Sequence, residues 1–109
     1  MRLNDVPDLL RRAAALLTDE NWIQGNSSRD ERGNEIYPDL PAACRWCTDG
    51  ALVKIAGPDE SVLHDEAQAA VLDVVEKMGF QSVEDWNDQP GRTAADVRKV
   101  LLKAADLYE

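Results

Sequence analysis

The chain contains few of the residues on which catalytic and metal sites usually depend. Its 109 residues include one histidine, two cysteines and six aromatic residues, of which three are tryptophans. No Gly-rich phosphate-binding loop of the Walker or dinucleotide type is present. Cys44 and Cys47 have C-x-x-C spacing, but a zinc site needs four ligands and a redox motif of this kind normally follows a strand. We therefore expect neither a metal nor a cofactor.

Long apolar runs are also lacking. No stretch approaches the roughly 18 consecutive apolar residues that a membrane span requires, and residues 1–5 do not resemble the start of a signal peptide. With two cysteines and no export signal, we expect a cytoplasmic protein with reduced thiols and no membrane contact. The length and the lack of repeats or linkers predict a single domain over residues 1–109.

Basic residues are nearly absent from one third of the chain. Residues 57–89 contain nine carboxylates and one base, Lys77, and so hold −8 of the net charge of −9. Such charge repels nucleic acid and attracts basic partners, although it also keeps a small protein in solution. Six of these residues form the predicted partner-binding surface, which we call the acidic set: Asp59, Glu60, Asp65, Glu66, Asp73 and Glu76.

The rest of the pattern is helical. Apolar residues recur at helical spacing over about 7–18, 41–56, 59–78 and 94–108, the last stripe reaching Tyr108. Local signals mark the expected ends, with caps at Asp5 or Val6, at Asp39 and at Asp59 or Ser61, stops at Gly57-Pro58 and Gly79, and a capping box of Thr93 and Asp96. The prediction is a mainly α fold, a compact bundle of about four helices.

The segment between the first two helices is polar and rich in turn residues. Because a long structureless loop is unusual in a compact domain, we predict a short polar hairpin or loop here. One arm is expected at 23–28, the turn at Asp30–Gly33 and the second arm at 35–37.

The densest chemistry outside the helices lies between Trp86 and Thr93. In a structural interpretation Trp86 fills the core, Asn87 and Asp88 form Asx turns, Pro90-Gly91 makes a type II turn, and Arg92 holds a carboxylate or a helix end. In a second interpretation the side chains line a ligand pocket. In a third, Asp88 is a general base, for which the sequence specifies no partner residue. The predicted pocket comprises Trp22, Gln24, Arg45, Asn87, Asp88 and Arg92.

Two tryptophan motifs are specific when taken together. Residues 46–52 read W-C-x-x-G-A-L and residues 86–93 read W-N-D-x-P-G-R-T. On these motifs, with Trp22-x-Gln24-Gly25 before them, the chain resembles a small family of bacterial and mobile-element proteins of unknown function. Cys44 departs from that pattern, and Asp96 stands where the family tends to have Glu. The resemblance supplies no activity, but it implies that one constellation holds Trp22, Gln24, Trp46, Cys47, Asn87, Asp88 and Arg92.

These features favour a non-enzymatic protein-interaction module that uses the acidic surface of residues 57–89. Its sharpest form is a phage or mobile-element inhibitor that mimics nucleic acid. We expect a protein partner with a basic surface and no direct binding of nucleic acid. The alternative is a small-molecule-binding or enzymatic domain with a polar pocket around Trp22, Gln24, Asn87, Asp88 and Arg92. A homodimer is a third interpretation.

Overall fold

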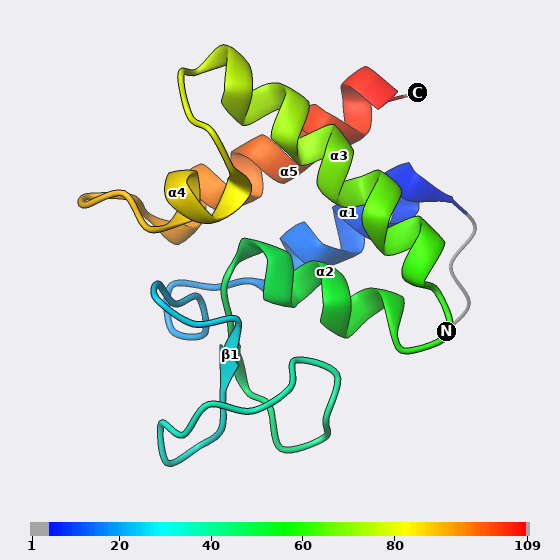
Figure 1. Ribbon diagram of the computed structural model, residues 1–109. Coiled ribbons are helices and arrows are strands. Elements are labelled where there is room, and N and C mark those ends of the chain that lie inside the picture. Colours follow the sequence, from blue (N-terminus) through cyan, green and yellow to red (C-terminus); the bar gives the residue numbers. More distant parts are fainter. Residues whose placement is uncertain (1–4, 109) are drawn as a thin grey trace.

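Helices make up most of the structure. The computed structural model describes residues 5–108. In chain order its elements are α1 (Val6–Leu16), β1 (Ser28–Arg29), β2 (Arg45–Trp46), α2 (Thr48–Ala56), α3 (Ser61–Lys77), α4 (Val83–Asn87) and α5 (Ala94–Tyr108) (Figure 1). The predicted mainly α fold is confirmed over these residues. A short helix, α4, and a two-stranded sheet are added to the four predicted helices.

The core forms around α1, which packs against α5, α2 and α3. The apolar stripe of α1 is buried as its periodicity predicts, and Leu9 and Leu10 have no exposed surface. Val75 of α3 and Leu101 of α5 are equally buried, and each such side chain contributes about 1.5–3 kcal/mol by leaving water. The stripe of α5 ends earlier than predicted. Tyr108 is 48% exposed, and its hydroxyl donates to Oε2 of Glu66 on the surface of α3 at 3.1 Å.

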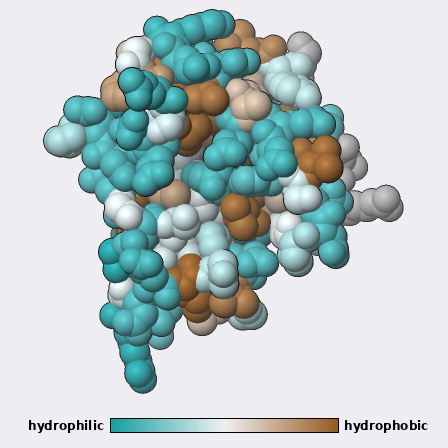
Figure 2. All heavy atoms as spheres, in the orientation of Figure 1, coloured by the Kyte–Doolittle hydropathy of each residue, from teal (hydrophilic) through white to brown (hydrophobic). Residues whose placement is uncertain are grey.

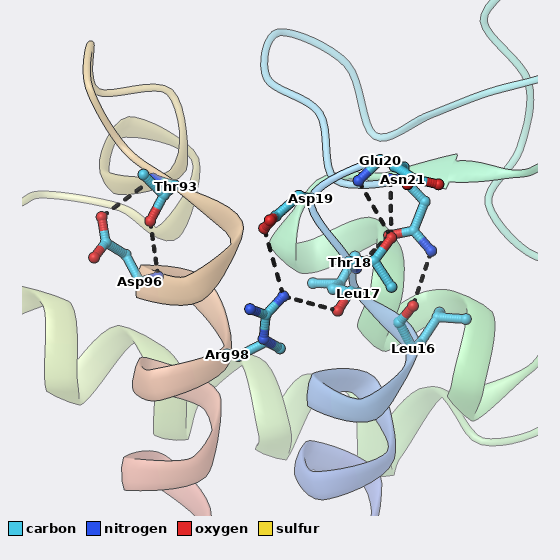
Figure 3. A network of polar contacts seen from close by, with 9 residues as sticks. All are labelled: Leu16, Leu17, Thr18, Asp19, Glu20, Asn21, Thr93, Asp96 and Arg98. Carbon is cyan, nitrogen blue, oxygen red and sulfur yellow. Dashed lines mark hydrogen bonds and ion pairs between the residues drawn. The ribbon is translucent and has the colours of Figure 1, made fainter.

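Arg98 joins α5 to the end of α1 (Figure 3). Its Nη1 donates to the carbonyl of Leu17, the C-cap of α1, at 3.2 Å and lies 3.9 Å from Oδ1 of Asp19. Beside it, Nδ2 of Asn21 donates to the carbonyl of Leu16 at 2.9 Å. The last carbonyls of a helix lack intrahelical donors and carry partial negative charge. The Arg98 guanidinium and the Asn21 amide therefore supply hydrogen-bond donors to the carbonyl groups at the C-terminal end of α1.

Several helix ends with local signals form as predicted, but the cap of α3 does not: its N-cap is Glu60, not Asp59 or Ser61, and no side chain caps it. Oδ1 of Asp5 accepts a hydrogen bond from the N–H of Asp8 at 2.9 Å and so caps α1. Thr93 and Asp96 exchange two hydrogen bonds of 3.1 Å, which is the predicted capping box of α5 (Figure 3). Gly91 has a φ of 84°, as the predicted type II turn requires at its third residue.

The second helix begins later than the sequence predicts. It starts at Thr48 rather than near Pro41, and its N-cap is Cys47 rather than Asp39. Sγ of Cys47 accepts a hydrogen bond from the N–H of Gly50 at 3.3 Å. The predicted helical placement of the C-x-x-C pair is therefore wrong, because the helix starts after both cysteines.

The residues before α2 form a strand for a tertiary reason. Strand β2 pairs antiparallel with β1. The N–H groups of Trp46 and Cys47 donate at 2.8 and 3.0 Å to carbonyls of the 21–27 segment. A helix would instead direct these N–H groups to its own preceding turn. Pairing with a distant segment thus overrides the local helical pattern.

The predicted hairpin is partly right. Its turn at Asp30–Gly33 is present, closed by a hydrogen bond of 3.0 Å from its last N–H to its first carbonyl. The predicted pairing of 23–28 with 35–37 is limited to the end of the first arm, because β1 takes β2 as its main partner. At that end the N–H of Ile36 donates to the carbonyl of Ser28 at 3.4 Å. A bridge between Arg29 and Glu35 and a hydrogen bond of 2.9 Å from the N–H of Asp30 to the carbonyl of Asn34 also join the two sides of the turn.

Helix α2 comes close to the preceding loop at Gly50. A Cβ at this position would lie 1.9 Å from the carbonyl oxygen of Ser27, which is well inside van der Waals contact. The glycine is therefore required for space and not for an unusual φ. It allows the first turn of α2 to lie against the backbone of the 21–29 segment.

We expect Gly50→Ala to lower the free energy of unfolding by at least about 2 kcal/mol, since overpacking forces backbone shifts. Helix propensity alone would favour Ala by about 1 kcal/mol, so the sign of the effect separates the two contributions. Urea denaturation measures it. A variant as stable as the parent would contradict the close approach.

Candidate functional site

Asn87, at the end of α4, is the centre of a buried polar network. The residue is 1% exposed. Its Oδ1 accepts from Nε1 of Trp22 at 2.8 Å and from the N–H and Oγ1 of Thr48 at 2.9 and 2.6 Å. Its Nδ2 donates to the carbonyl of Ile23 at 3.1 Å and to Oδ1 of Asp88 at 2.9 Å. One amide thus ties the 22–23 segment, the start of α2 and the end of α4 together.

Gln24 and Asp88 extend this network. Nε2 of Gln24 donates to the carbonyls of Asn87 and Gln89 at 3.0 and 2.9 Å. In return, Oδ1 of Asp88 accepts from the N–H of Gly25 at 3.0 Å. We call this set the Asn87 clasp: Trp22, Gln24, Thr48, Asn87 and Asp88. The expected Asx turn at Asn87 is wrong, because its side chain bonds to distant segments.

Four of the six predicted pocket residues, Trp22, Gln24, Asn87 and Asp88, thus meet in the clasp, and two lie elsewhere. The guanidinium of Arg92 lies 4.4 Å from the ring centre of Trp86, and its Nε donates to the Trp86 carbonyl at 2.9 Å. It therefore holds the C-terminal end of α4, as the structural interpretation of the sequence predicts. Nη1 of Arg45 donates instead to the carbonyl of Asp30 at 3.0 Å.

A hollow of about 390 Å³ lies beside the clasp. Its lining is polar and includes four carboxylates, from Glu35, Asp49, Glu84 and Asp88, and no Lys, Arg or His. Of these, Asp88 alone is a predicted pocket residue. The other three come from a loop, α2 and α4, and no sequence spacing relates them. Within residues 5–108, no group of three or more His, Cys, Asp or Glu side chains is arranged to hold a metal ion.

Cys47 and His64 have structural roles. Burial raises the pKa of the Cys47 thiol to about 11, so the group stays protonated and weakly nucleophilic at neutral pH. Both cysteines are free thiols. His64 bridges two helices, with Nε2 2.8 Å from Oδ1 of Asp49 in α2 and Nδ1 3.2 Å from Oδ1 of Asp65 in its own helix.

All six residues of the acidic set are exposed to solvent. Four members lie on α3, where about 100° of rotation per residue places Asp65, Glu66, Asp73 and Glu76 within an arc of about 100°. Ala67 and Val71 face the core on the other side. In the described part of the chain, no member forms an ion pair with Lys or Arg; Asp65 contacts His64, and Glu66 accepts from Tyr108. Figure 2 shows a largely hydrophilic face in the view in which α3 lies in front, interrupted by separate hydrophobic patches.

Comparison with known proteins identifies the family. The sequence model of DUF6197, a family of unknown function, matches residues 1–107. The chain belongs to DUF6197. The resemblance to a small family of unknown function is therefore confirmed. No curated protein and no solved structure matches this DUF6197 chain. Over residues 5–108, no helix is both long and apolar enough to span a bilayer.

Six of the seven motif residues of this DUF6197 chain meet as the resemblance implied, and the seventh, Arg92, lies against Trp86 instead. Trp22 forms a parallel bridge with Trp46 in addition to its bond to Asn87. Cys47, next in the chain, caps α2 and lines the hollow together with Asp88. The two tryptophan motifs are thus joined through α2, α4 and the 22–25 segment.

We expect Asn87→Asp to lower the free energy of unfolding by about 3 kcal/mol or more. The substitution keeps the size of the side chain but places a carboxylate oxygen against the Ile23 carbonyl and the Asp88 carboxylate, with no donor between them. Urea denaturation at neutral pH measures the loss. Gln89→Glu, which adds the same charge on an exposed side chain, should change stability by less than about 0.5 kcal/mol.

Proposed function

We propose that this DUF6197 protein acts by binding a basic surface of another protein and that it catalyses no reaction. The observation that carries the proposal is the unneutralised face of α3, where four carboxylates share one arc without a Lys or Arg partner among the described residues. A face of this kind creates a strong negative potential that steers basic partners toward it.

The same charge bears on the kind of partner. It repels nucleic acid, so direct binding of DNA or RNA is not part of the proposal. It attracts proteins whose own function is to bind phosphates, because regularly placed carboxylates on a rigid helix offer Lys and Arg side chains an alternative partner. A cytoplasmic inhibitor that competes with nucleic acid, carried by a phage or another mobile element, is the specific form that we propose.

Neutralising the α3 face tests this function. We expect the variant D65N/E66Q/D73N/E76Q to lose at least about tenfold in affinity for its captured partner, with the greatest loss at low salt. Immobilised protein, host lysate and mass spectrometry identify the captured protein, and titration of the purified partner measures the affinity.

A control with the same change in net charge keeps this test specific. The variant D19N/E20Q/E31Q/D106N neutralises four exposed carboxylates outside the acidic set and should capture as the parent does. Equal capture by both variants would overturn the proposal, provided that both show the helical circular dichroism of the parent.

The hollow beside the clasp favours a second candidate function, the binding of a small organic cation. Its volume of about 390 Å³ lies in the range of small-molecule sites. Four carboxylates without a base in the lining suit an amine or a guanidinium. Because the Asn87 side chain is fully bonded within the clasp, the recognising groups would be the carboxylates and Gln68.

Two neighbouring carboxylates of α4 provide a matched test of this second candidate. Glu84 lines the hollow and Asp85 does not, although both are exposed. We expect spermidine or arginine to raise the melting temperature of the parent and of Asp85→Asn, and to lose most of this effect in Glu84→Gln. The same shift in all three proteins would indicate non-specific charge screening instead of a site.

A further inference from the structure

A groove of about 500 Å³ lies between α3 and the last turn of α5. Its floor is made of small side chains, from Ala70 and Val74 of α3 and from Ala104 of α5. Small residues on facing helices leave room above them that larger side chains would fill. The groove is thus distinct from the hollow beside the Asn87 clasp, which lies between α2, α4 and the 25–27 segment.

The α5 wall of the groove is apolar and open to solvent. Leu107 is 62% exposed and Tyr108 is 48% exposed, although both line the groove. Two large side chains left in water beside a floor of alanines and valine form a small apolar surface without an occupant from within residues 5–108. Apolar surface next to polar residues is typical of protein contact sites.

The α3 wall is acidic. Glu66 and Asp73 of the acidic set line the groove seven residues apart, and Lys77 contributes one base at its end. Oε2 of Glu66 accepts from the hydroxyl of Tyr108 at 3.1 Å, which links the two walls and raises the pKa of Tyr108. The groove therefore combines an apolar floor and one apolar wall with a carboxylate rim that continues into the exposed face of α3.

We propose that this groove holds an amphipathic helix of the partner protein, with the apolar side of that helix over Leu107 and the alanines and its Lys or Arg residues against Glu66 and Asp73. This inference rests on the proposed function and names the partner segment that it requires. A helix fits better than an extended peptide, because both walls are helices and offer no strand edge. A second copy of the chain fits poorly, because two copies would bring the carboxylate rims together.

A designed peptide tests the inference before the partner itself is identified. The probe is a fluorescent 18-residue peptide of Leu and Lys, with Leu at i, i+3, i+4 and i+7 spacing so that one face is apolar. Its control has the same composition in an order that gives no apolar face. Fluorescence anisotropy measures the binding of both peptides to the full chain, and light scattering measures the oligomeric state.

Two protein variants distinguish binding in the groove from attraction of the peptide by the net charge of the protein. We expect the amphipathic peptide to bind the parent at least about tenfold more tightly than the scrambled peptide, and Leu107→Asp to remove this preference. Leu102→Asp is the matched control. Leu102 is 45% exposed on the same helix, does not line the groove and lies about 140° around the helix from Leu107. Its variant should retain the preference.

Each outcome tests either the proposed use of the groove or the proposed function on which it rests. Both peptides could bind equally, with binding lost in D65N/E66Q/D73N/E76Q and unchanged in Leu107→Asp. That result would overturn the proposal that the groove holds a helix, but it would leave the proposed role of the acidic face standing. Absence of peptide binding would also overturn the groove, and lysate capture would then decide the function independently. A dimer that Leu107→Asp dissociates would identify a second copy as the occupant and overturn the inference.

Discussion

The buried amide of Asn87 is the interaction on which the arrangement of the other segments depends. Its oxygen accepts hydrogen bonds from Trp22 and from Thr48, the first residue of α2, and its nitrogen donates to the carbonyl of Ile23. A typical protein hydrogen bond contributes about 1 kcal/mol net, but a buried group left without its partner costs about 1–3 kcal/mol. Removal of one amide would leave several buried groups unpaired at once, and the cost would fall on three segments together.

The clasp also explains the position of α2. The two donors of Thr48 fix the start of this helix against α4, while Gly50 allows its first turn to lie against the Ser27 carbonyl. These constraints act on opposite sides of the same turn and leave little freedom in its placement. Asp49, between the two constrained residues, is then directed to His64 of α3 at 2.8 Å. The hollow that contains Asp49, Glu84 and Asp88 is thus a consequence of how the clasp sets α2 against α4.

Features encoded within a few residues could be predicted from the sequence, and features that join distant segments could not. The Thr93 and Asp96 capping box and the Gly91 turn require only local geometry, and both form as predicted. The predicted start of α2 is too early, because the apolar spacing around Trp46 fits a helix equally well until its pairing with residues 21–29 is known. Four of the predicted pocket residues do meet, since the motif resemblance groups them. Their role as mutual partners depends on hydrogen bonds across more than 60 residues of sequence, which no local pattern specifies.

The hydrogen-bonded side chains of the Asn87 clasp and the carboxylates of α3 without a basic partner lie in different parts of the molecule, and we propose that the latter are functional. The polar side-chain atoms of Trp22 and Asn87 and Nε2 of Gln24 are bonded within the fold, and Arg92 is held against Trp86, so these motif residues maintain the arrangement of the helices. The carboxylates on the outer face of α3 differ, because the core side of the same helix already provides its stability through Ala67 and Val71. Exposed ion pairs contribute about 0–1 kcal/mol to folding, so adding bases opposite these acids would have stabilised the fold only slightly. An unpaired acidic face therefore costs the fold little and leaves its charge available to a partner, which is why we assign the proposed interaction to α3 and its groove with α5.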